Sequence, residues 1–328
     1  MPNQAFLAAW KDACYGSISS TLLIPKFKTF LLNYLRFEGP CKYDIHVQVD
    51  GNIKRPNQIW NGQEYWIIFH QVTSLSIMGS GEIDGQGSNW WSCKENKQCP
   101  FMAANSLVVM NSKQVVVDGL RLTNSPMMHL VVGFSSEVTI NNLQITAPGN
   151  SPNTDGIHIE QSYNVTVSNS VIGTGDDCVS ISNNTYNVNV NGVTCGPGHG
   201  ISIGSLGAKN SWATSENIHI KNCNLFDTTN GLRIKTWQVR STTDIFLSLQ
   251  FVFKRTWMFG GYGYAKAISF ENIKMTRVYN PIIIDQHYCN GGSNCQYEPA
   301  NGGKVFASCV NAYGTKYSVF PSVDCLRG

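Results

Sequence analysis

Short stretches in which hydrophobic and polar residues alternate recur along the chain. They begin at Leu75, Val115, Val138, Val165, Val188, Ile218 and Ile268. Strict alternation is typical of a β-strand with one buried face. From Val115 to Ile218, successive starts are 23, 27, 23 and 30 residues apart. These intervals are too short for two strands joined by a full helix, and they fit one coil of a parallel β-helix.

A second family of alternating stretches lies between members of the first. Its members are Gly156–Ile159, Cys178–Ile181, Gly200–Ile203, Gly231–Ile234 and Pro281–Ile284. Their starts are 22, 22, 31 and 50 residues apart. Each member should add one row of apolar side chains to a continuous core. The pattern therefore predicts an all-β protein, a right-handed parallel β-helix that occupies residues 1–328 as a single domain.

Residues 239–259 interrupt this spacing. From Ile218 to Ile268, and from Gly231 to Pro281, the interval is 50 residues, and without the 21 residues of the segment it would be 29, close to the preceding 30 and 31. The segment contains an aromatic and apolar run that matches no coil and would expose an adhesive patch. We predict that 239–259 is an insertion. A retained intron is the favoured explanation, and a lid over a functional groove is the alternative.

The composition excludes several classes of protein. With 42% hydrophobic and 14% charged residues, the chain cannot be disordered. It contains 32 Asn and 30 Gly, which favour turns with positive φ, and asparagines can form hydrogen-bonded ladders where equivalent turns stack. The net charge of +3 is spread without a basic run, which argues against nucleic acid as a partner. We find neither a membrane span nor a signal peptide in the sequence.

The eleven cysteines lack the C-x-x-C spacing of a zinc site, so disulfides are expected instead. Cys93 and Cys99 enclose five residues, as do Cys289 and Cys295, and this spacing suits small closed loops. The odd number leaves one cysteine over. Disulfides indicate an oxidising compartment, which conflicts with the lack of a readable signal peptide.

Charged residues collect on one outer face of the predicted β-helix. Just before the second strand family, equivalent positions in successive coils are Asp155, Asp177, His199 and Asn230, with Asp176 beside Asp177. Further along each strand, pointing away from the core, come first His158, Ser180, Ser202 and Arg233, and then Glu160, Ser182, Gly204 and Lys235. Because neighbouring strands lie about 4.8 Å apart, these side chains should form one cluster.

Such a cluster suits acid–base chemistry. Like charges at this spacing cost stability unless one carboxyl keeps its proton. A protonated carboxyl can donate to a leaving oxygen while ionised neighbours deprotonate a water, as in glycoside hydrolysis. His199 can tune the acid, and Arg233 and Lys235 are suited to the carboxylate of an acidic sugar. Taken singly, each motif is more often an ordinary turn or a solvated strand, and it is their alignment that favours a site.

The motifs of this cluster resemble those of the polygalacturonases, glycoside hydrolase family 28. They are Asn153-Thr154-Asp155, Gly175-Asp176-Asp177, Gly198-His199-Gly200 and Arg233-Ile234-Lys235. The resemblance is to the plant branch and covers residues 4–238 and 260–327. It implies hydrolysis of α-1,4-galacturonosidic bonds in pectin, with inversion at the anomeric carbon by a two-carboxylate mechanism.

The resemblance also assigns roles to individual residues. It implies that Asp176 is the general acid, that Asp155 and Asp177 position and activate the water, and that His199 supports the acid. Arg233 and Lys235 would bind galacturonate. Tyr288 matches a subsite tyrosine, and a packing role for it is equally open. These are the candidate catalytic and substrate-binding residues.

The resemblance further implies a secreted protein of the plant cell wall that acts on pectic polysaccharide as a monomer. Neither nucleic acid nor a membrane is expected as a partner, and no cofactor or metal is expected, since zinc, EF-hand and nucleotide-binding spacings are missing from the sequence. Relative to the family, we expect part of the N-terminal capping sequence, and some coils after Cys295, to be lacking.

Two other functions stay open. The first is a catalytically impaired, polysaccharide-binding β-helix from a truncated or mis-spliced gene, although all three aspartates are present. The second is a calcium-dependent lyase of similar architecture, which would need carboxylates arranged for a metal together with a cationic base. A chelator added to a degradation assay separates lyase from hydrolase.

Overall fold

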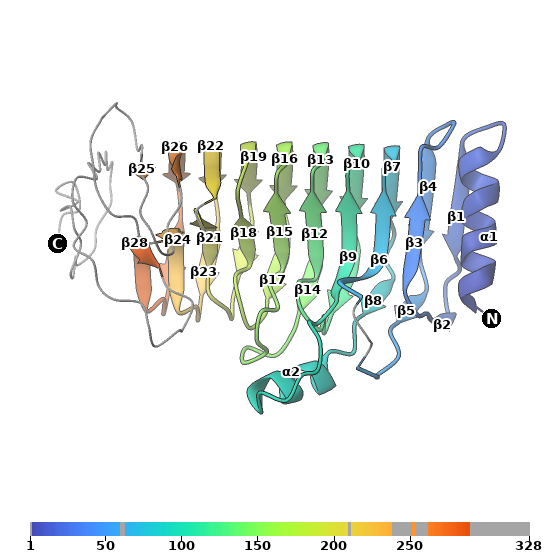
Figure 1. The fold of residues 1–328 in the computed structure, drawn as a ribbon, viewed down its shortest axis with the longest axis horizontal. Helices are drawn as coiled ribbons and strands as arrows, with labels where there is room; N and C mark the ends of the chain where they lie inside the picture. Colours follow the sequence, from blue (N-terminus) through green and yellow to red (C-terminus); the bar gives the residue numbers. More distant parts are fainter. Residues whose placement is uncertain (1, 60–62, 209–210, 238–250, 254–261, 289–328) are drawn as a thin grey trace.

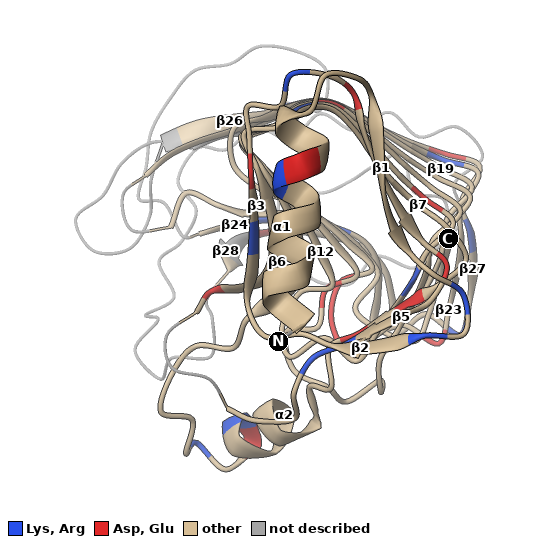
Figure 2. Cartoon of the chain, turned by 90° about the vertical axis from the view of Figure 1, so that its right-hand side faces the viewer, with Lys and Arg blue, Asp and Glu red and all other residues tan. Residues whose placement is uncertain are grey.

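The computed structural model describes residues 2–59, 63–208, 211–237, 251–253 and 262–288. Within these residues the chain winds into coils that stack along one axis (Figure 1). Each coil places one strand in each of three sheets, here called sheets 1, 2 and 3. Viewed from the N-terminal end, sheet 3 lies on the left, sheet 1 on the right and sheet 2 below (Figure 2). The predicted all-β parallel β-helix is confirmed.

Parallel pairing orders the strands by coil, and only β25 runs antiparallel to its neighbour among the described strands. Sheet 1 contains β1 (Ser20–Ile24), β4 (Ile45–Val49), β7 (Thr73–Met78), β10 (Lys113–Asp118), β13 (Ser136–Asn141), β16 (Tyr163–Ser168), β19 (Thr185–Asn191), β22 (Trp212–Lys221), β26 (Tyr262–Glu271) and β25 (Phe251–Phe253). Sheet 2 contains β2 (Thr29–Leu31), β5 (Asn52–Lys54), β8 (Glu82–Asp84), β11 (Arg121–Thr123), β14 (Gln144–Thr146), β17 (Val171–Gly173), β20 (Thr194–Cys195), β23 (Asn224–Phe226) and β27 (Lys274–Thr276). Sheet 3 contains β3 (Leu35–Glu38), β6 (Tyr65–His70), β9 (Asn105–Met110), β12 (Leu130–Gly133), β15 (Ile157–Glu160), β18 (Val179–Ile181), β21 (Ile201–Leu206), β24 (Asn230–Trp237) and β28 (Asn280–Tyr288).

The register of sheet 1 matches the spacing in the sequence. Val115, Val138, Val165, Val188 and Ile218 pair in succession from coil to coil. Each of these side chains is at most 1% exposed, because alternate residues of every strand point into the coil. Full burial of a valine or isoleucine side chain contributes about 1.5–3 kcal/mol. Each coil therefore adds its own share to a core that runs along the solenoid.

Asparagine and glycine form the corner between sheet 1 and sheet 2. The residue after the sheet 1 strand has a positive φ in successive coils, at Gly119, Asn142, Asn169, Gly192, Asn222 and Asn272. Asparagine and glycine adopt this conformation more readily than other residues. The side-chain amide of Asn222 donates to Oδ1 of Asn191, and that of Asn272 donates to Oδ1 of Asn222, both at 2.8 Å. This corner therefore accounts for part of the excess of these two residue types in the composition.

Helix α1 (Pro2–Tyr15) lies across the N-terminal end of the solenoid (Figure 2). Trp10 is buried against Phe37 and Phe69, with ring centroids 5.0 and 5.5 Å away. The sequence pattern did not predict this helix, which covers the first coil. That part of the family's N-terminal capping sequence is lacking stays a prediction. Neither α1 nor the other described helix, α2 (Ser88–Glu95), is long and apolar enough to cross a membrane.

The described residues contain three disulfides and one free cysteine, Cys223, which is buried. The disulfides are Cys14–Cys41, Cys93–Cys99 and Cys178–Cys195. The small loop predicted for Cys93 and Cys99 is thus present. The other predicted loop, at Cys289 and Cys295, lies outside the described residues. The stretch after Cys295, where we expect some coils to be lacking, also lies outside them.

The segment 239–259 also lies outside the described residues, except for β25. The coils before and after it pair directly, with Ile218 opposite Ile268 in sheet 1 and Asn230 opposite Asn280 in sheet 3. That the segment is an insertion stays a prediction.

Truncation of a core residue tests the contribution of a single coil. Ile159 in β15 is fully buried, and Ile159→Ala should lower the free energy of unfolding by about 2–5 kcal/mol, because it removes buried methyl groups and leaves a cavity. Urea unfolding followed by circular dichroism measures the change. Thr166→Ala, at an outward position of β16, is the control and should change it by about 0.5 kcal/mol or less. Equal effects of the two substitutions would contradict a continuous core at this coil.

Candidate active site

The predicted cluster forms at the edge of sheet 3. Ile157, Val179, Ile201 and Leu232 pair in succession, so the residues two positions earlier stack in the same order. These are Asp155, Asp177, His199 and Asn230. The structure thus brings together the four candidate catalytic residues, since Asp176 directly precedes Asp177.

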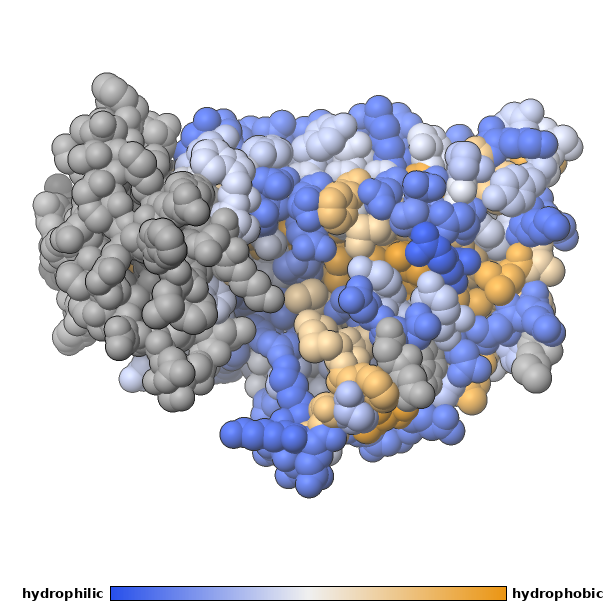
Figure 3. All heavy atoms as spheres, viewed as in Figure 1, coloured by the Kyte–Doolittle hydropathy of each residue, from blue (hydrophilic) through white to orange (hydrophobic). Residues whose placement is uncertain are grey.

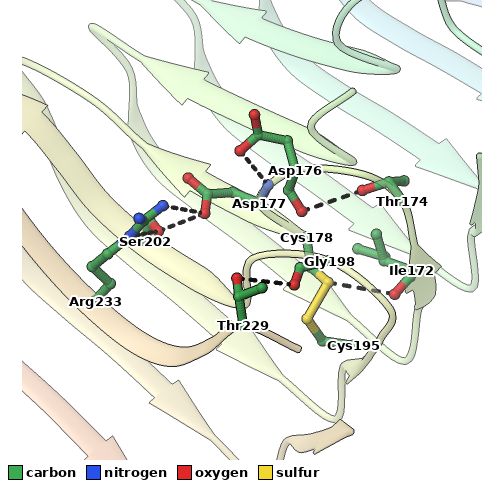
Figure 4. Close-up of a disulfide and its surroundings, with 10 residues drawn as sticks. All are labelled: Ile172, Thr174, Asp176, Asp177, Cys178, Cys195, Gly198, Ser202, Thr229 and Arg233. Carbon is green, nitrogen blue, oxygen red and sulfur yellow. Dashed lines mark hydrogen bonds and ion pairs between the residues drawn. A yellow bond between two sulfur atoms is a disulfide. The ribbon is translucent and has the colours of Figure 1, made fainter. Parts of the chain in front are cut away.

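A disulfide anchors the turn that carries Asp176 and Asp177 (Figure 4). Cys178, the next residue, is joined to Cys195 of β20, and both are fully buried. The backbone N–H of Cys178 donates to the carbonyl of Gly200 in the next coil at 2.7 Å. The turn is therefore tied both to sheet 2 and to the coil that carries His199.

Asp177 is buried between two cations. Its Oδ1 accepts hydrogen bonds from Ser202 Oγ at 2.7 Å and from Arg233 Nη2 at 2.8 Å, as Figure 4 shows. Its Oδ2 accepts one from Lys235 Nζ at 2.9 Å. Only 2% of the Asp177 side chain is exposed. A buried carboxylate is tolerated only with such partners, so the two candidate galacturonate-binding residues also hold Asp177 in place.

Asp176 is paired with His199. Nδ1 of His199 lies 3.0 Å from Asp176 Oδ1, and the backbone N–H of Asp177 donates to the same oxygen at 2.8 Å. Burial by itself would raise the pKa of Asp176, but the hydrogen bond with His199 and its charge outweigh burial, and the pKa of Asp176 is lowered. The same hydrogen bond raises the pKa of His199. Each member of the pair therefore favours the charged form of the other.

Asp155 stands in a different electrostatic environment. Burial, followed by the charges of Asp176 and Asp177, raises the pKa of Asp155 to about 7. Ser180 Oγ donates to Asp155 Oδ2 at 2.7 Å, which opposes the shift only in part. In the free protein below about pH 7, Asp155 therefore carries a proton, whereas the resemblance implies Asp176 as the donor.

His129, which was not among the predicted site residues, hydrogen-bonds the backbone of Asp155. The ring is fully buried; its Nε2 accepts a hydrogen bond from the backbone N–H of Ser125 at 3.2 Å, and its Nδ1 lies 3.1 Å from the Asp155 carbonyl oxygen. Because Nε2 accepts, Nδ1 carries the hydrogen and donates to Asp155. Burial lowers the pKa of His129 to about 4, so the ring is neutral near pH 7. In the strand register His129 is opposite Gly156, the residue that follows Asp155 in the next coil. This alignment could have revealed the contact from the sequence.

Tyr288 lies at the opposite end of the cluster from Asp155. Lys235 Nζ is 5.3 Å from the centroid of the Tyr288 ring, and Trp237 meets that ring edge-on at 5.7 Å. The packing role that the sequence left open is therefore present. A contact between Tyr288 and substrate stays a prediction.

Lys94, which was also not among the predicted site residues, adds a positive charge near the cluster. It lies in α2, which projects below sheet 3 in Figure 1. Partial burial lowers the pKa of Lys94, and the negative charges of Asp176 and Asp155 oppose that shift. Lys94 thus interacts electrostatically with Asp176 and Asp155, although it does not lie on a strand of sheet 3. Since α2 lies in the connection between β8 and β9, the strand register could not place it.

The cluster also contains atoms spaced for a metal ion. Single ligand atoms of Asp176, Asp177 and His199 lie within 4.8 Å of one another. In the free protein these atoms already have partners, because Asp177 is paired with Arg233 and Lys235, and Asp176 with His199. Two neighbouring cations disfavour a further positive charge, so the residues present fit a metal poorly.

Comparison with known proteins gives one consistent result. The family model for glycosyl hydrolases family 28 matches residues 14–248 and 253–307. A polygalacturonase of Persea americana is 42% identical over 99% of this chain and 67% of its own length. The chain spans between 54% and 68% of the length of the curated relatives that it matches here.

Solved structures show the same architecture. An endo-xylogalacturonan hydrolase from Aspergillus tubingensis superposes with a TM-score of 0.73 and 25% identity over 89% of this chain and 74% of its own. A polygalacturonase from Erwinia carotovora ssp. carotovora superposes with a TM-score of 0.70 and 25% identity over 89% of this chain and 78% of its own.

The raised pKa of Asp155 predicts a pH-dependent stability. A carboxyl with a higher pKa in the folded than in the unfolded state stabilises the fold below the unfolded value, near 4, and this contribution is lost as the pH rises towards about 7. Asp155→Asn should therefore gain stability relative to the parent between pH 4 and 7, by up to about 4 kcal/mol. Urea unfolding at both pH values measures the difference. Asp44→Asn, at an exposed position, is the control, and a difference that does not change with pH would contradict the raised pKa.

Proposed function

Because this chain belongs to family 28 of the glycosyl hydrolases, we propose that it hydrolyses α-1,4-galacturonosidic bonds in pectin. The observation that carries the proposal is the alignment of three aspartates beside the cations Arg233 and Lys235. Carboxyl groups supply the acid and the base of glycoside hydrolysis. Cations beside them favour a sugar that carries a carboxylate.

Asp176 is proposed to protonate the leaving oxygen. The pair has two forms with the same number of protons. In one form His199 is an imidazolium and Asp176 a carboxylate, and in the other His199 is neutral and Asp176 is a carboxylic acid. The two forms differ only in which side of the 3.0 Å contact holds the proton. His199 can therefore keep Asp176 supplied with a proton, even though the pKa of Asp176 is lowered in the free protein.

Asp155 and Asp177 are proposed to hold the attacking water, which leads to inversion at the anomeric carbon. They occupy equivalent positions in neighbouring coils, and Ser180 and Ser202 orient their carboxyl groups. Asp155 can accept a proton from water only after it has lost its own. Its pKa of about 7 therefore limits the reaction on the acidic side.

Arg233 and Lys235 are proposed to bind the carboxylate of a galacturonate residue. Both stand beside Asp177 in the free protein, and each has donors beyond those that Asp177 uses. A substrate carboxylate would share these cations with Asp177. The two residues then link recognition of the acidic sugar to the position of the water-activating carboxylate.

The setting of the reaction is also a proposal. The protein is proposed to work outside the cell, in the cell wall, and the three disulfides among the described residues support the first of these, an oxidising compartment. All the groups of the site come from one chain, so a monomer suffices for the reaction. The binding protein without catalysis and the metal-dependent lyase are less well supported, because the acid set is complete and the site atoms are already paired.

Replacement of the proposed acid tests the mechanism. Asp176→Asn keeps the shape of the side chain but has no proton to donate, so hydrolysis of polygalacturonate should fall by about 10²–10⁴-fold. Release of reducing ends measures the rate, and calorimetric titration with a galacturonate oligomer should show binding largely retained. Asp118→Asn, on sheet 1, is the matched control. Full activity of Asp176→Asn would remove Asp176 from this role.

Removal of divalent metal tests the lyase alternative. We expect chelator to leave the rate on polygalacturonate unchanged, because Arg233 and Lys235 already supply positive charge at Asp177. The assay should also record ultraviolet absorbance, since elimination creates a conjugated double bond and hydrolysis does not. Loss of activity with chelator, restored by calcium, would support a lyase.

A further inference from the structure

His158 lies on the outer face of sheet 3, and the proposed reaction steps do not use it. It pairs with Ser180 in the register of β15 and β18. Nδ1 of His158 lies 2.8 Å from Ser180 Oγ, and the same Oγ lies 2.7 Å from Asp155 Oδ2. One buried hydroxyl therefore bridges the imidazole and the carboxyl group of the proposed base.

The bridge can hold its hydrogens in two arrangements, because a hydroxyl both donates and accepts. When Asp155 is ionised, Ser180 donates to Asp155 and accepts from Nδ1–H of His158. When Asp155 is protonated, it donates to Ser180, which in turn donates to Nδ1. The two arrangements contain the same number of protons. A proton can therefore pass between Asp155 and His158 through the hydroxyl.

A second bridge, one coil further on, has the same form but a different cation. Ser202 Oγ donates to Asp177 Oδ1 at 2.7 Å and accepts from Arg233 Nε at 3.1 Å. A guanidinium keeps its protons, whereas an imidazole changes charge between pH 5 and 8. The bridge to Asp177 is therefore fixed in one arrangement, and the bridge to Asp155 can reverse.

The far side of the His158 ring leads towards solvent. Its Nε2 lies 3.8 Å from Glu160 Oε2, and the two side chains are 14% and 34% exposed. Contact with His158 lowers the pKa of Glu160, so a carboxylate faces the ring. On β12 the paired residue is Val131, which carries no charge. Figure 3 shows hydrophilic surface over β15 and β18. A proton on His158 can therefore reach water beside Glu160.

The titratable groups around Asp155 come from four parts of the fold. They are Asp176 and Asp177 in the turn before β18, His129 before β12, Lys94 in α2 and His158 on β15 itself. Burial and the two neighbouring aspartates raise the pKa of Asp155, and His158 opposes them. The ring of His129 contacts the Asp155 backbone and is neutral near pH 7. Within this group, the shared hydroxyl links His158 to the carboxyl itself.

We infer that His158 is a positioning residue for the proposed base, which takes up through the Ser180 hydroxyl the proton that Asp155 receives from the attacking water. The inference rests on the proposed function, since it follows the proton of that reaction. As the water oxygen bonds to the anomeric carbon, one water proton passes to Asp155. Asp155 then gives a proton to Ser180 Oγ while Ser180 gives its own to His158 Nδ1. His158, with hydrogen on Nε2 before the transfer, carries hydrogen on both nitrogens after it and loses one to water.

The pH dependence of hydrolysis gives the first test. His158→Asn keeps an N–H donor near Ser180 but cannot take up a proton. The acidic limb of kcat/KM on polygalacturonate should move up by about one pH unit, because a cation that favours ionised Asp155 is lost. The alkaline limb, which depends on the acid Asp176, should stay in place, and KM should change little. An equal loss at every pH, or a rise in KM alone, would overturn the inference.

His219→Asn is the matched control. Nδ1 of His219 lies 2.6 Å from Ser269 Oγ on sheet 1, so the same histidine–serine contact is removed on a different face. This variant should keep the pH profile of the parent. A shift as large as that of His158→Asn would contradict a specific role for His158.

A double substitution tests whether His158 acts through Ser180. Ser180→Ala removes the bridging hydroxyl and should move the acidic limb in the same direction as His158→Asn. Because both break one bridge, the double variant should lose no more activity than the weaker of the two single variants. Circular dichroism checks that all three fold. Losses that multiply would overturn the inference.

Nitrogen-15 NMR of the imidazole rings gives a test that needs no turnover. Asp155→Asn removes the negative charge at the far end of the bridge, so His158 should take up its second proton at a pH lower by about one unit than in the parent. His219 should titrate as before. An unchanged His158 would overturn the inference. A protein that shows the coupling but cleaves no polygalacturonate would contradict the proposed function instead.

Discussion

The parallel pairing of each coil with the next is the constraint on which the rest of the structure depends. It fixes neighbouring strands about 4.8 Å apart, so residues 22 or 31 positions apart in the sequence become neighbours in space. Ile157, Val179 and Ile201 bury their side chains inside the solenoid. The residues two positions before them are placed on the outer edge by the same pairing. Packing of the inward side chains thus fixes where the catalytic side chains lie on the outer edge of the sheet.

The site concentrates like charges, which by itself costs stability. Three different arrangements offset the cost. Asp177 is paired with Arg233 and Lys235, Asp176 with His199, and Asp155 keeps a proton below about pH 7. Three aspartates that look alike in the sequence therefore occupy three electrostatic environments, and such differences allow carboxyl groups of one site to take different roles.

The sequence predicted the strands and site residues whose positions follow from the repeat, and it missed features in segments outside the repeat. Alternation and spacing were sufficient to align Asp155, Asp177 and His199, because a parallel register leaves no freedom once the inward residues are known. Helix α1 and Lys94 belong to segments without repeat partners. His129 was missed because the sequence does not show that its ring is buried. In the structure the buried ring hydrogen-bonds the backbone carbonyl of Asp155. The pKa of Asp155 likewise depends on burial first and on its neighbours second.

The asparagine and glycine corner has a consequence for how such a protein can evolve. Because Asn142, Asn169, Asn222 and Asn272 make equivalent turns, one coil can replace another at this corner without loss of register. Duplication or deletion of a coil before β12 would leave Asp155, Asp177, His199 and Lys235 in the same positions relative to one another. The same event between β15 and β24 would move Asp155 relative to Lys235 by about 5 Å and take the site apart. The number of coils can therefore change in evolution without moving the aspartates relative to one another, provided that the short block carrying the charged residues is inherited intact.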